Sequence, residues 1–562
     1  MGRNHAAPRV MCPQRTRHTG RRPWLGCRVP EDRHQHDRDQ HDGHQHDRQP
    51  WALPQVLETQ ARVRGDRTFL TVVGEGSLTY AAAAREARQV AAHLAAGGVR
   101  PGDAVAVLLP NGLDFVRLWL GIGRLGAVIV PVNTALTGGF LAHQLRDSGA
   151  KAVVAAGALA EGVAEVAEEV PGMAAVDLDG WERAPEHDGP LPTPRDTACV
   201  MYTSGTTGPS KGVLMPHAHC YLFGLGSIEG LGLTEADRYY VTMPLFHANG
   251  LFMQLGATLI AGASAVLRGR FSASAWLADV REHRCTVTNL LGAMSQFVIA
   301  QPETPHDRDH SLRVVCPVPN PPAHERAWRE RFGVPEVVTA YGMTEVNIPL
   351  YGRLGVSRQG TAGRVLDRWF EVEVRDPDTD ELLPRGVVGE IMVRPRVPFA
   401  FMAGYVGLPE KTVEAWRSFW FHTGDSGVMD GDGWVTFVDR TKDCIRRRGE
   451  NISSFEVESA IARLAGVAEV AAYAVPAGEE GTEDEVMLSV VVKPGSGLDA
   501  PGVAAHADRV LPRFARPRYI QLVDALPKTP TAKVRKQELR SRGVTAATWD
   551  RTVGATPRPS SS

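Results

Sequence analysis

The chain has no excess of charge of either sign and few aromatic residues. Its 62 Lys and Arg residues nearly balance 64 Asp and Glu residues over 562 positions, and aromatic residues make up 7% of the chain. This balance excludes a protein that binds nucleic acid through bulk positive charge. With 43% hydrophobic residues, the composition is that of an ordinary globular protein. At about 150 residues per domain, the length predicts roughly three to four structural units.

Cysteine is scarce, which narrows the expected environment. The seven cysteines are scattered along the chain and are never spaced as C-x-x-C. An odd number in this arrangement argues against a disulfide framework and against a structural zinc site. We therefore expect a reducing, cytoplasmic location.

Long hydrophobic runs are also missing, with one borderline case. Residues 250–267 carry no charge and reach the lower length limit of a membrane span, about 18 residues. Because they include Gln254, Thr258, Ser264 and three glycines, we interpret them as a buried helix that passes into a strand. We predict no transmembrane segment.

The two ends of the chain differ in composition from the middle. Residues 1–50 hold seven histidines and ten arginines with almost no large aliphatic side chains. Such a segment cannot bury enough apolar surface to offset the entropy of ordering it, which predicts a disordered extension. The alternative is a metal-binding tail, because His and Asp are ligands for zinc, nickel or copper. Residues 542–562 are polar and are expected to form a flexible tail.

From residue 51 onward, short valine-rich runs alternate with longer segments of helical period. Residues 104–109, 127–130 and 152–155 are predicted buried strands, and residues 112–125 repeat apolar side chains on one helical face. Strand, helix and strand in repetition predict α/β layers with a parallel sheet.

One motif in this region is a decoy. Gly121, Gly123 and Gly126 satisfy the spacing G-x-G-x-x-G. A dinucleotide-binding motif must follow a strand and open a helix, whereas these glycines follow the predicted helix and precede a strand. They therefore indicate a helix end.

After about residue 367 the chain changes to shorter alternating segments. Residues 370–374 and 389–393 favour a small antiparallel barrel or sheet. The unit from 441 to 540 combines a predicted helix at 454–464 with strands at 470–475 and 485–492, which is the size and content of a small α+β domain.

The most informative stretch is Met201 to Gly212, with the sequence MYTSGTTGPSKG. Three glycines allow tight turns and expose backbone N–H groups, five hydroxyls can donate hydrogen bonds, and Lys211 adds positive charge. Together they predict a cradle for a polyphosphate. The Walker pattern is excluded, because it needs Gly at position 210 and Ser or Thr at position 212. A P-loop kinase or ATPase is therefore disfavoured.

At this point the sequence resembles the adenylate-forming superfamily of acyl- and aryl-CoA synthetases, peptide-synthetase adenylation domains and luciferases. It is most similar to bacterial ligases of the crotonobetaine/carnitine-CoA ligase type. The resemblance runs in order from about residue 55 to 550. Besides YTSGTTGPSKG it includes LTY at 78–80, PLFHANG at 244–250, YGMTE at 341–345, GY at 404–405 with PE at 409–410, TGD at 423–425, DRTKD at 439–443, GENI at 449–452 and PKTPTAK at 527–533.

The resemblance implies a fold and a domain division. The fold class is α/β, with a large N-terminal body of two α/β subdomains plus a small β-barrel, and a mobile α+β C-terminal domain. An AMP-binding domain at 51–440 would follow the extension at 1–50, and a cap domain at 441–541 would precede the tail at 542–562.

The resemblance also implies residue roles at the nucleotide. Glu345 is expected to bind Mg²⁺, Thr344 to approach the α-phosphate, and Tyr341 to stack on adenine. Asp425 suits vicinal ribose hydroxyls because a carboxylate is an acceptor with two oxygens. The remaining nucleotide-binding positions are Thr203, Ser204, Gly205, Thr206, Thr207, Gly208 and Lys211 for the β- and γ-phosphates, with Gly342 beside Tyr341 and Arg440 beside the ribose.

Further roles fall on the cap and on one histidine. Lys533 would bridge the attacking carboxylate and the α-phosphate, although Ala532 stands where many members have glycine. Lys442 would be the hinge about which the cap rotates between two reactions. His247 would lie beside the acyl carboxylate, and the alternative for it is a structural histidine. Arg446, Arg448 and Gly449 would lie on the CoA side, and the alternative for this basic run is a solvated charge cluster.

These residues imply an ATP-dependent carboxylic acid–CoA ligase that uses Mg²⁺. It would form an acyl-adenylate with release of pyrophosphate, and then a thioester with release of AMP. The expected acid has an uncharged, apolar body, because residues 247–252 and 289–294 offer no basic anchor, and a homodimer is possible. The alternatives are transfer to an amine or a carrier protein, activation of another acid such as nitrite by a diazotase, and a nucleotide binder without activity.

Overall fold

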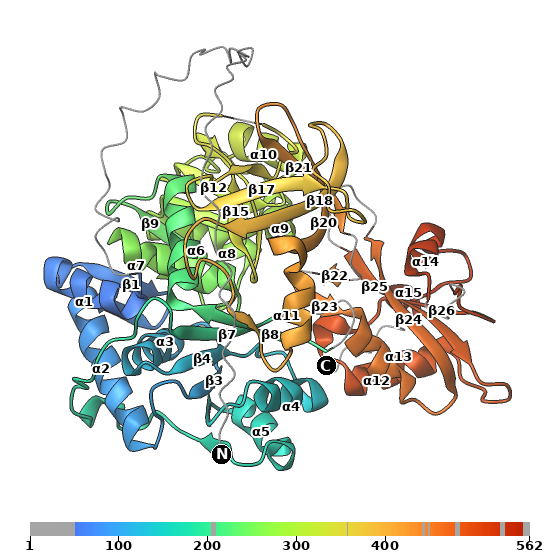
Figure 1. Cartoon of the computed structure of the whole chain (residues 1–562), viewed down its shortest axis with the longest axis horizontal. Helices are drawn as coiled ribbons and strands as arrows, with labels where there is room; N and C mark the ends of the chain where they lie inside the picture. Colours follow the sequence, from blue (N-terminus) through green and yellow to red (C-terminus); the bar gives the residue numbers. More distant parts are fainter. Residues whose placement is uncertain are drawn as a thin grey trace, which may run out of the picture. The chain divides into compact units, whose positions relative to one another are not determined.

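The computed structural model describes residues 51–203, 209–356, 358–440, 444–447, 450–477, 484–528 and 534–554. The predictions for residues 1–50 and for the last eight residues lie outside this part of the chain. Residues 50–562 form one compact unit by their contacts. Figure 1 shows its helices and strands in chain order.

One seven-stranded sheet carries the predicted valine-rich strands. It has the order β19-β8-β7-β4-β3-β5-β6, parallel from β7 to β6, with β8 and β19 antiparallel. The bounds are β3 Ala104–Leu108, β4 Val128–Pro131, β5 Ala152–Ala155, β6 Ala174–Ala175, β7 Thr197–Thr203, β8 Lys211–Pro216 and β19 Gly404–Tyr405. The predicted strands at 104–109, 127–130 and 152–155 are confirmed as β3, β4 and β5.

The glycine decoy ends a helix, as predicted. Helix α3, Leu113–Leu125, closes on Gly126 at φ 76°, and β4 begins two residues later. Gly121 has a packing role, because a Cβ there would lie 2.4 Å from the Val90 side chain of α2, Tyr80–Ala96. The two helices can pack this closely only because position 121 has no side chain.

A second seven-stranded sheet has the order β13-β12-β11-β9-β10-β1-β2 and is parallel except for the β1–β2 pair. Its bounds are β1 Thr68–Val72, β2 Gly76–Thr79, β9 Arg238–Val241, β10 Ser264–Leu267, β11 Val287–Leu291, β12 Val314–Val318 and β13 Glu336–Val337. The borderline run at 250–267 becomes the π-helix η4, Asn249–Gly256, then α7, Ala257–Ala261, then β10. In the described residues no helix is long and apolar enough to cross a membrane.

Helix α6, His217–Leu231, lies at the junction of the sheets. It contacts β7 and β8, and also η4 and α7. Nearly every residue of α6 is buried, as expected for a helix that is apolar on all sides. The remaining helices of the body are α1 Leu53–Arg64, α4 Gly138–Asp147, α5 Ala158–Glu165, α8 Ala273–Glu282, α9 Gly292–Ile299, α10 Pro322–Glu330 and α11 Pro409–Ala415, with the short 3₁₀ turns η2 Ala167–Glu169, η3 Trp181–Arg183 and η5 Arg417–Phe419.

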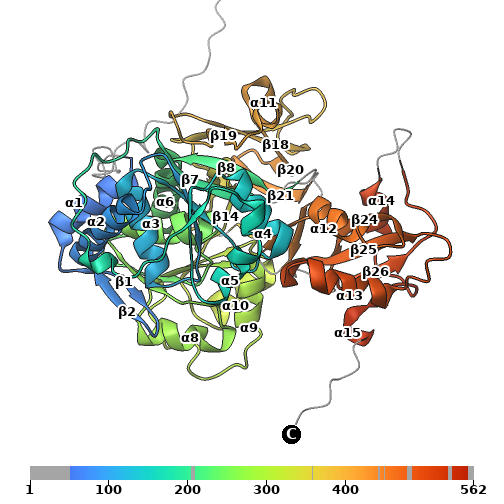
Figure 2. The same ribbon diagram turned by 90° about the horizontal axis from the view of Figure 1, so that it is seen from below.

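The third seven-stranded sheet is antiparallel, as the alternation after residue 367 predicts. Its order is β14-β15-β16-β21-β20-β18-β17. The bounds are β14 Ala340–Met343, β15 Asn347–Tyr351, β16 Gly363–Val365, β17 Phe370–Arg375, β18 Val388–Pro395, β20 Phe421–Met429 and β21 Trp434–Arg440. Figure 2 shows α11 beside β19, near β18 and β20.

The C-terminal unit is a small α+β structure. The hairpin β22 Cys444–Arg447 and β23 Glu450–Ser453 precedes the sheet β24 Val467–Pro476, β25 Asp484–Val492, β26 Tyr519–Leu522 and β27 Trp549–Asp550. Helices α12 Ser454–Ala462 and α13 Ala500–Val510 share one apolar cluster with the sheet, and α14 Lys536–Arg542 shares another. The turn η6, Arg513–Ala515, and helix α15, Arg551–Gly554, complete it. Because β27 pairs with β26, ordered structure extends into the segment expected to be a flexible tail.

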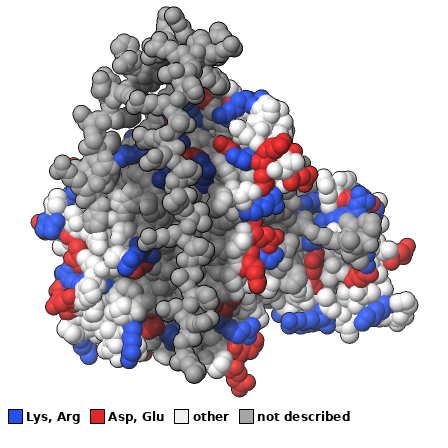
Figure 3. All heavy atoms as spheres, in the orientation of Figure 1, with Lys and Arg blue, Asp and Glu red and all other residues white. Residues whose placement is uncertain are grey.

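The described surface carries both signs of charge. On the face seen in Figure 3, basic and acidic side chains are interspersed. This agrees with the balanced composition, which excludes a nucleic-acid binder that works by bulk charge.

Candidate active site

The polyphosphate segment joins two paired strands of the first sheet. Thr203, at the end of β7, pairs in register with Lys211, at the start of β8. The five residues between Thr203 and Pro209, which are Ser204 to Gly208, lie outside the described part of the chain. The structure therefore locates the two ends of the predicted cradle.

Glu345 is held at one end of this segment. Its Oε1 accepts hydrogen bonds from the Thr203 hydroxyl at 3.3 Å and from the Tyr405 hydroxyl at 3.1 Å. The side chain is 5% exposed, so Glu345 is not a solvated surface residue. Burial, together with the charge of Glu345, raises the pKa of Tyr405 well above its usual range, which keeps the hydroxyl protonated as a donor. The Lys211 ammonium lies 4.3 Å from the centre of the Tyr405 ring.

The segment that carries Thr344 and Glu345 is held by two residues that sequence reasoning missed. His219 of α6 places Nε2 2.8 Å from the Thr344 carbonyl oxygen and Nδ1 2.6 Å from the Ala400 carbonyl oxygen. Burial lowers the pKa of His219 to about 4, so the ring is neutral at pH 7. Asn347 donates from Nδ2 to the His219 carbonyl oxygen at 2.9 Å. The available signal was polar side chains inside otherwise apolar segments.

Gly342 has a packing reason of its own. A Cβ there would lie 2.1 Å from the Asn347 carbonyl oxygen across the β14–β15 hairpin. The tight hairpin holds Tyr341 and Glu345 on either side of one short turn. Gly342 therefore shapes the site through its backbone.

Tyr341 and Asp425 meet at the other side of the site. The Tyr341 hydroxyl donates to Asp425 Oδ2 at 2.8 Å, and both side chains are buried. Asp425 pairs in register with Arg440 where β20 meets β21. The structure thus brings together all three residues that the resemblance placed at one end of a nucleotide, and the hydrogen bond orients the carboxylate.

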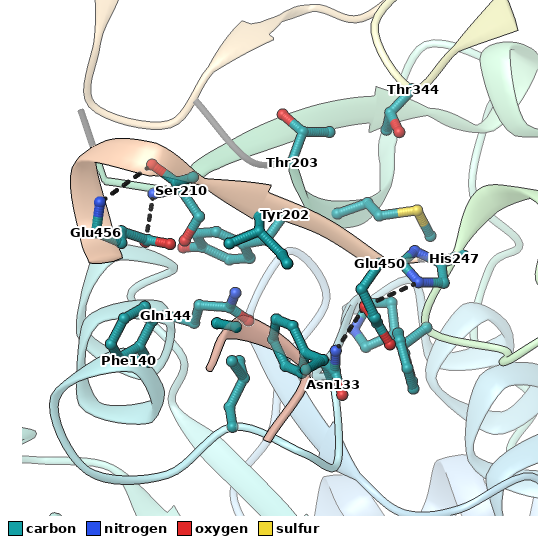
Figure 4. Close-up of a pocket in the computed structure, with 18 residues that line it drawn as sticks. Asn133, Phe140, Gln144, Tyr202, Thr203, Ser210, His247, Thr344, Glu450 and Glu456 are labelled. Carbon is teal, nitrogen blue, oxygen red and sulfur yellow. Dashed lines mark hydrogen bonds and ion pairs between the residues drawn. The ribbon is translucent and has the colours of Figure 1, made fainter. Parts of the chain in front are cut away.

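His247 faces the cap. Its Nε2 lies 3.5 Å from Glu450 Oε2, and Asn133 donates from Nδ2 to the same oxygen at 3.0 Å. Figure 4 shows Glu450 between His247 and Asn133 in a pocket that Thr203 and Thr344 also line. His247 and Thr344 therefore share this pocket, as predicted. Glu450 and Asn133 received no role from the sequence, because residues over 300 positions apart form the contact.

The basic run of the cap is partly used inside the cap. Arg447 lies 2.6 Å from Glu485 and donates to the carbonyl oxygens of Phe514 and Arg516. Arg446 is partly buried. Of the other predicted cap residues, Lys442, Arg448, Gly449 and Lys533 lie outside the described residues.

The described side chains fit a nucleotide with Mg²⁺. One buried carboxylate beside two hydroxyls and a lysine matches a hard ion that is held mostly by phosphate oxygens. Among the described residues no group of three or more His, Cys, Asp or Glu side chains forms a separate metal cluster.

Comparison with protein families gives two matches. Residues 57–406 match the model of the AMP-binding enzyme, and residues 456–533 match that of the AMP-binding enzyme C-terminal domain. Among curated proteins, sulfoacetate–CoA ligase from Cupriavidus necator is 34% identical over 508 residues, covering 86% of this chain and 98% of that protein. A crotonobetaine/carnitine–CoA ligase from Salmonella paratyphi A is 30% identical over 514 residues, covering 87% and 98%.

Two solved structures are similar over nearly their whole length. The o-succinylbenzoate CoA synthetase from Bacillus subtilis, bound with a product analogue, has a TM-score of 0.78 and 27% identity, and the match covers 88% of this chain and 99% of that one. The amide bond synthetase McbA from Marinactinospora thermotolerans has a TM-score of 0.75 and 26% identity, covering 87% and 99%.

Proposed function

The chain belongs to the AMP-binding enzyme family, and on this premise we propose that it is an ATP-dependent carboxylic acid–CoA ligase. The first step joins the carboxylate to the α-phosphorus of ATP and expels pyrophosphate. The second joins the acyl group to the thiol of CoA and releases AMP. The observation that carries the proposal is the buried Glu345 beside Thr203, Tyr405 and Lys211, because it combines a metal-binding carboxylate with donors for phosphate oxygens.

The first step requires several negative charges to be positioned and neutralised. Thr203 and Lys211 hold the β- and γ-phosphates, and Asp425, oriented by Tyr341, accepts hydrogen bonds from the ribose. Mg²⁺ bound at Glu345 supplies charge neutralisation and a fixed geometry for the phosphate oxygens. We keep Lys533 as the residue that bridges the carboxylate and the α-phosphate, since a compact charge on a flexible stem suits two anions.

The second step needs the thiol to reach the acyl carbon. The pocket of His247, Thr344 and Glu450 lies between the body and the cap, where an acceptor arm can approach the adenylate. A neutral His247 can accept the thiol proton, and Glu450 at 3.5 Å stabilises the imidazolium that results. We also propose that residues 51–440 and 441–541 act as body and cap.

We further propose that the acid has an uncharged body. Residues 247–252 and 289–294, which are expected to line its pocket, contain no Lys, Arg, Asp or Glu. An isolated charge buried there would lack a partner. Sulfoacetate and carnitine each carry a second charge, so we expect this chain to prefer a different acid from those named for its two curated relatives.

A panel of acids with ATP, Mg²⁺ and CoA tests the proposal. Uncharged aliphatic and aromatic acids are compared with sulfoacetate and carnitine, by release of AMP and by the mass of the product. We expect a CoA thioester with at least one uncharged acid. No acid-dependent exchange of pyrophosphate into ATP would refute an adenylating enzyme, and a preference for the charged acids would refute only the uncharged body.

A second candidate function is transfer of the acyl group to an amine. The similarity to an amide bond synthetase favours it. Release of AMP that depends on an added amine and not on CoA would establish this alternative. Transfer to a carrier protein and activation of nitrite remain outcomes of the same assay.

Replacing Tyr341 by Phe tests the ribose site. The substitution removes the hydroxyl that orients Asp425, and a hydrogen bond to a charged group contributes roughly 1.5–3 kcal/mol. We expect the KM for ATP to rise about tenfold or more, with a smaller change in kcat. Tyr240→Phe removes a hydroxyl bonded to Asp279 in a separate apolar cluster and should leave the KM for ATP unchanged. Equal effects of both variants would contradict the assignment.

Replacing Lys442 by Pro tests the hinge. A fixed φ at this position should restrict rotation of the cap. We expect thioester formation to fall more than adenylate formation, measured separately by product mass and by pyrophosphate exchange. If both fall to the same extent, position 442 is not the hinge.

A further inference from the structure

Ser210, directly before β8, is held from two sides by residues distant in sequence. Its backbone N–H donates to Glu456 Oε1 at 2.7 Å, and its carbonyl oxygen lies 2.8 Å from His143 Nε2, which donates to it. His143 belongs to α4 in the body, whereas Glu456 belongs to α12 in the cap. Figure 4 shows Glu456 beside Ser210 at the edge of the pocket. The cap therefore contacts the end of the polyphosphate segment directly.

The direction of Glu456 differs from what its local sequence predicts. Ser453 is the N-cap of α12 and accepts from the Glu456 N–H at 3.3 Å. Ser followed three residues later by Glu is a capping box, in which the glutamate turns back to the N-cap N–H of its own helix. Here the carboxylate extends to a backbone N–H of the body. Its place in the first turn of α12 still suits a negative charge.

Burial makes this position costly for the carboxylate. It raises the pKa of Glu456, and the hydrogen bonds from Ser210 and the nearby His143 only partly oppose it. Apolar contacts fix the approach, since Phe140 of α4 packs against the apolar cluster of the cap and Phe514 of the cap packs against a cluster of the body. The position of Glu456 is thus set by packing of the two units around it.

We infer that Glu456 is a positioning residue that admits the cap to this arrangement only when the polyphosphate segment is empty. The inference rests on the proposed function, in which Thr203 to Lys211 bind the phosphates. A bound pyrophosphate brings several negative charges next to Ser210, where they repel the Glu456 carboxylate and compete for the same N–H group. Release of pyrophosphate therefore precedes docking of the cap, which orders the two half-reactions.

A distance measurement that needs no carboxylic acid tests this inference. Spin labels on Lys151→Cys in the body and Lys493→Cys in the cap, both exposed positions, report cap docking by pulsed electron resonance. The full chain is used with Cys12, Cys27 and Cys444 replaced by Ser, since the other four cysteines are buried. The ligand is inorganic pyrophosphate with Mg²⁺, and its binding is measured in parallel by calorimetry.

We expect saturating pyrophosphate to lower the ratio of docked to undocked molecules about tenfold. In Glu456→Gln, which keeps an acceptor oxygen and removes the charge, the same ligand should lower that ratio by no more than about twofold. Glu469→Gln is the matched control, because Glu469 is a cap carboxylate that pairs with Lys528 of the cap, and it should respond like the parent chain.

Two outcomes would overturn the inference. One is an equal response of Glu456→Gln and the parent chain, which would show that the charge of Glu456 is not what pyrophosphate displaces. The other is pyrophosphate that binds without changing the docked fraction of the parent chain. If calorimetry detects no pyrophosphate binding at all, the proposed polyphosphate site fails, and the inference fails with it.

Discussion

Replacing Glu345 by Gln is expected to lower the rate of adenylate formation by about 10²–10³-fold. A glutamine oxygen can still accept from Thr203 and Tyr405, so the local hydrogen bonds persist. The negative charge that binds Mg²⁺ is lost, and a neutral amide is a weaker ligand for a hard cation. The measurement is pyrophosphate exchange into ATP over a series of Mg²⁺ concentrations, and the apparent Mg²⁺ affinity should fall together with the rate.

The control for this variant is another glutamate with known partners. Glu371 on β17 pairs with Arg394 and Arg396 at the surface, and Glu371→Gln should leave the Mg²⁺ dependence unchanged. Retention of the full exchange rate in Glu345→Gln would show that Mg²⁺ is held by other groups. The metal assignment of Glu345 would then be wrong.

The second large effect is expected from Lys533→Ala. Loss of the charge that bridges the carboxylate and the α-phosphate should lower adenylate formation by at least about 10²-fold. Thioester formation from a supplied acyl-adenylate should stay within a few-fold of the parent rate, because in that arrangement of the cap the lysine is withdrawn from the site. The two half-reactions are measured separately, by pyrophosphate exchange and by the mass of the CoA product.

Lys528→Ala is the matched control. Lys528 lies five positions earlier, and its ammonium pairs with Glu469 within the cap at 2.7 Å. We expect this variant to retain both half-reactions. An equal loss of both half-reactions in Lys533→Ala would contradict the division of roles between the two cap arrangements.

Much of the site was predictable because its chemistry is encoded in short contiguous segments. Thr203, Tyr341, Thr344 and Glu345 lie in two such segments, and the structure brings Thr203 and Glu345 into contact. The strands at 104–109, 127–130 and 152–155 were predictable for a similar reason, since burial on both faces of a parallel sheet requires continuous apolar runs. Such runs depend only on neighbouring residues.

The supports of the site were not predictable in this way. His219 holds the Thr344 carbonyl from 125 positions away, and nothing in the apolar sequence of α6 marks it as a partner of that loop. The direction of Glu456 was also unpredictable, because its local pattern indicates a capping box. The ordered strand β27 escaped prediction since its two residues gain their hydrogen bonds from β26, some thirty positions earlier.

The sequence by itself determined the chemical groups and the family. Glycines, hydroxyls, one lysine and single carboxylates in ordered motifs define a polyphosphate and nucleotide site, and apolar periodicity defines the α/β layers. The tertiary structure alone decided which groups meet: Tyr341 with Asp425, Asn133 and His247 with Glu450, and Ser210 with Glu456. The physical reason is range, since helix and strand patterns arise from neighbours in sequence, whereas these contacts form only when packing of distant segments brings their side chains within hydrogen-bonding distance.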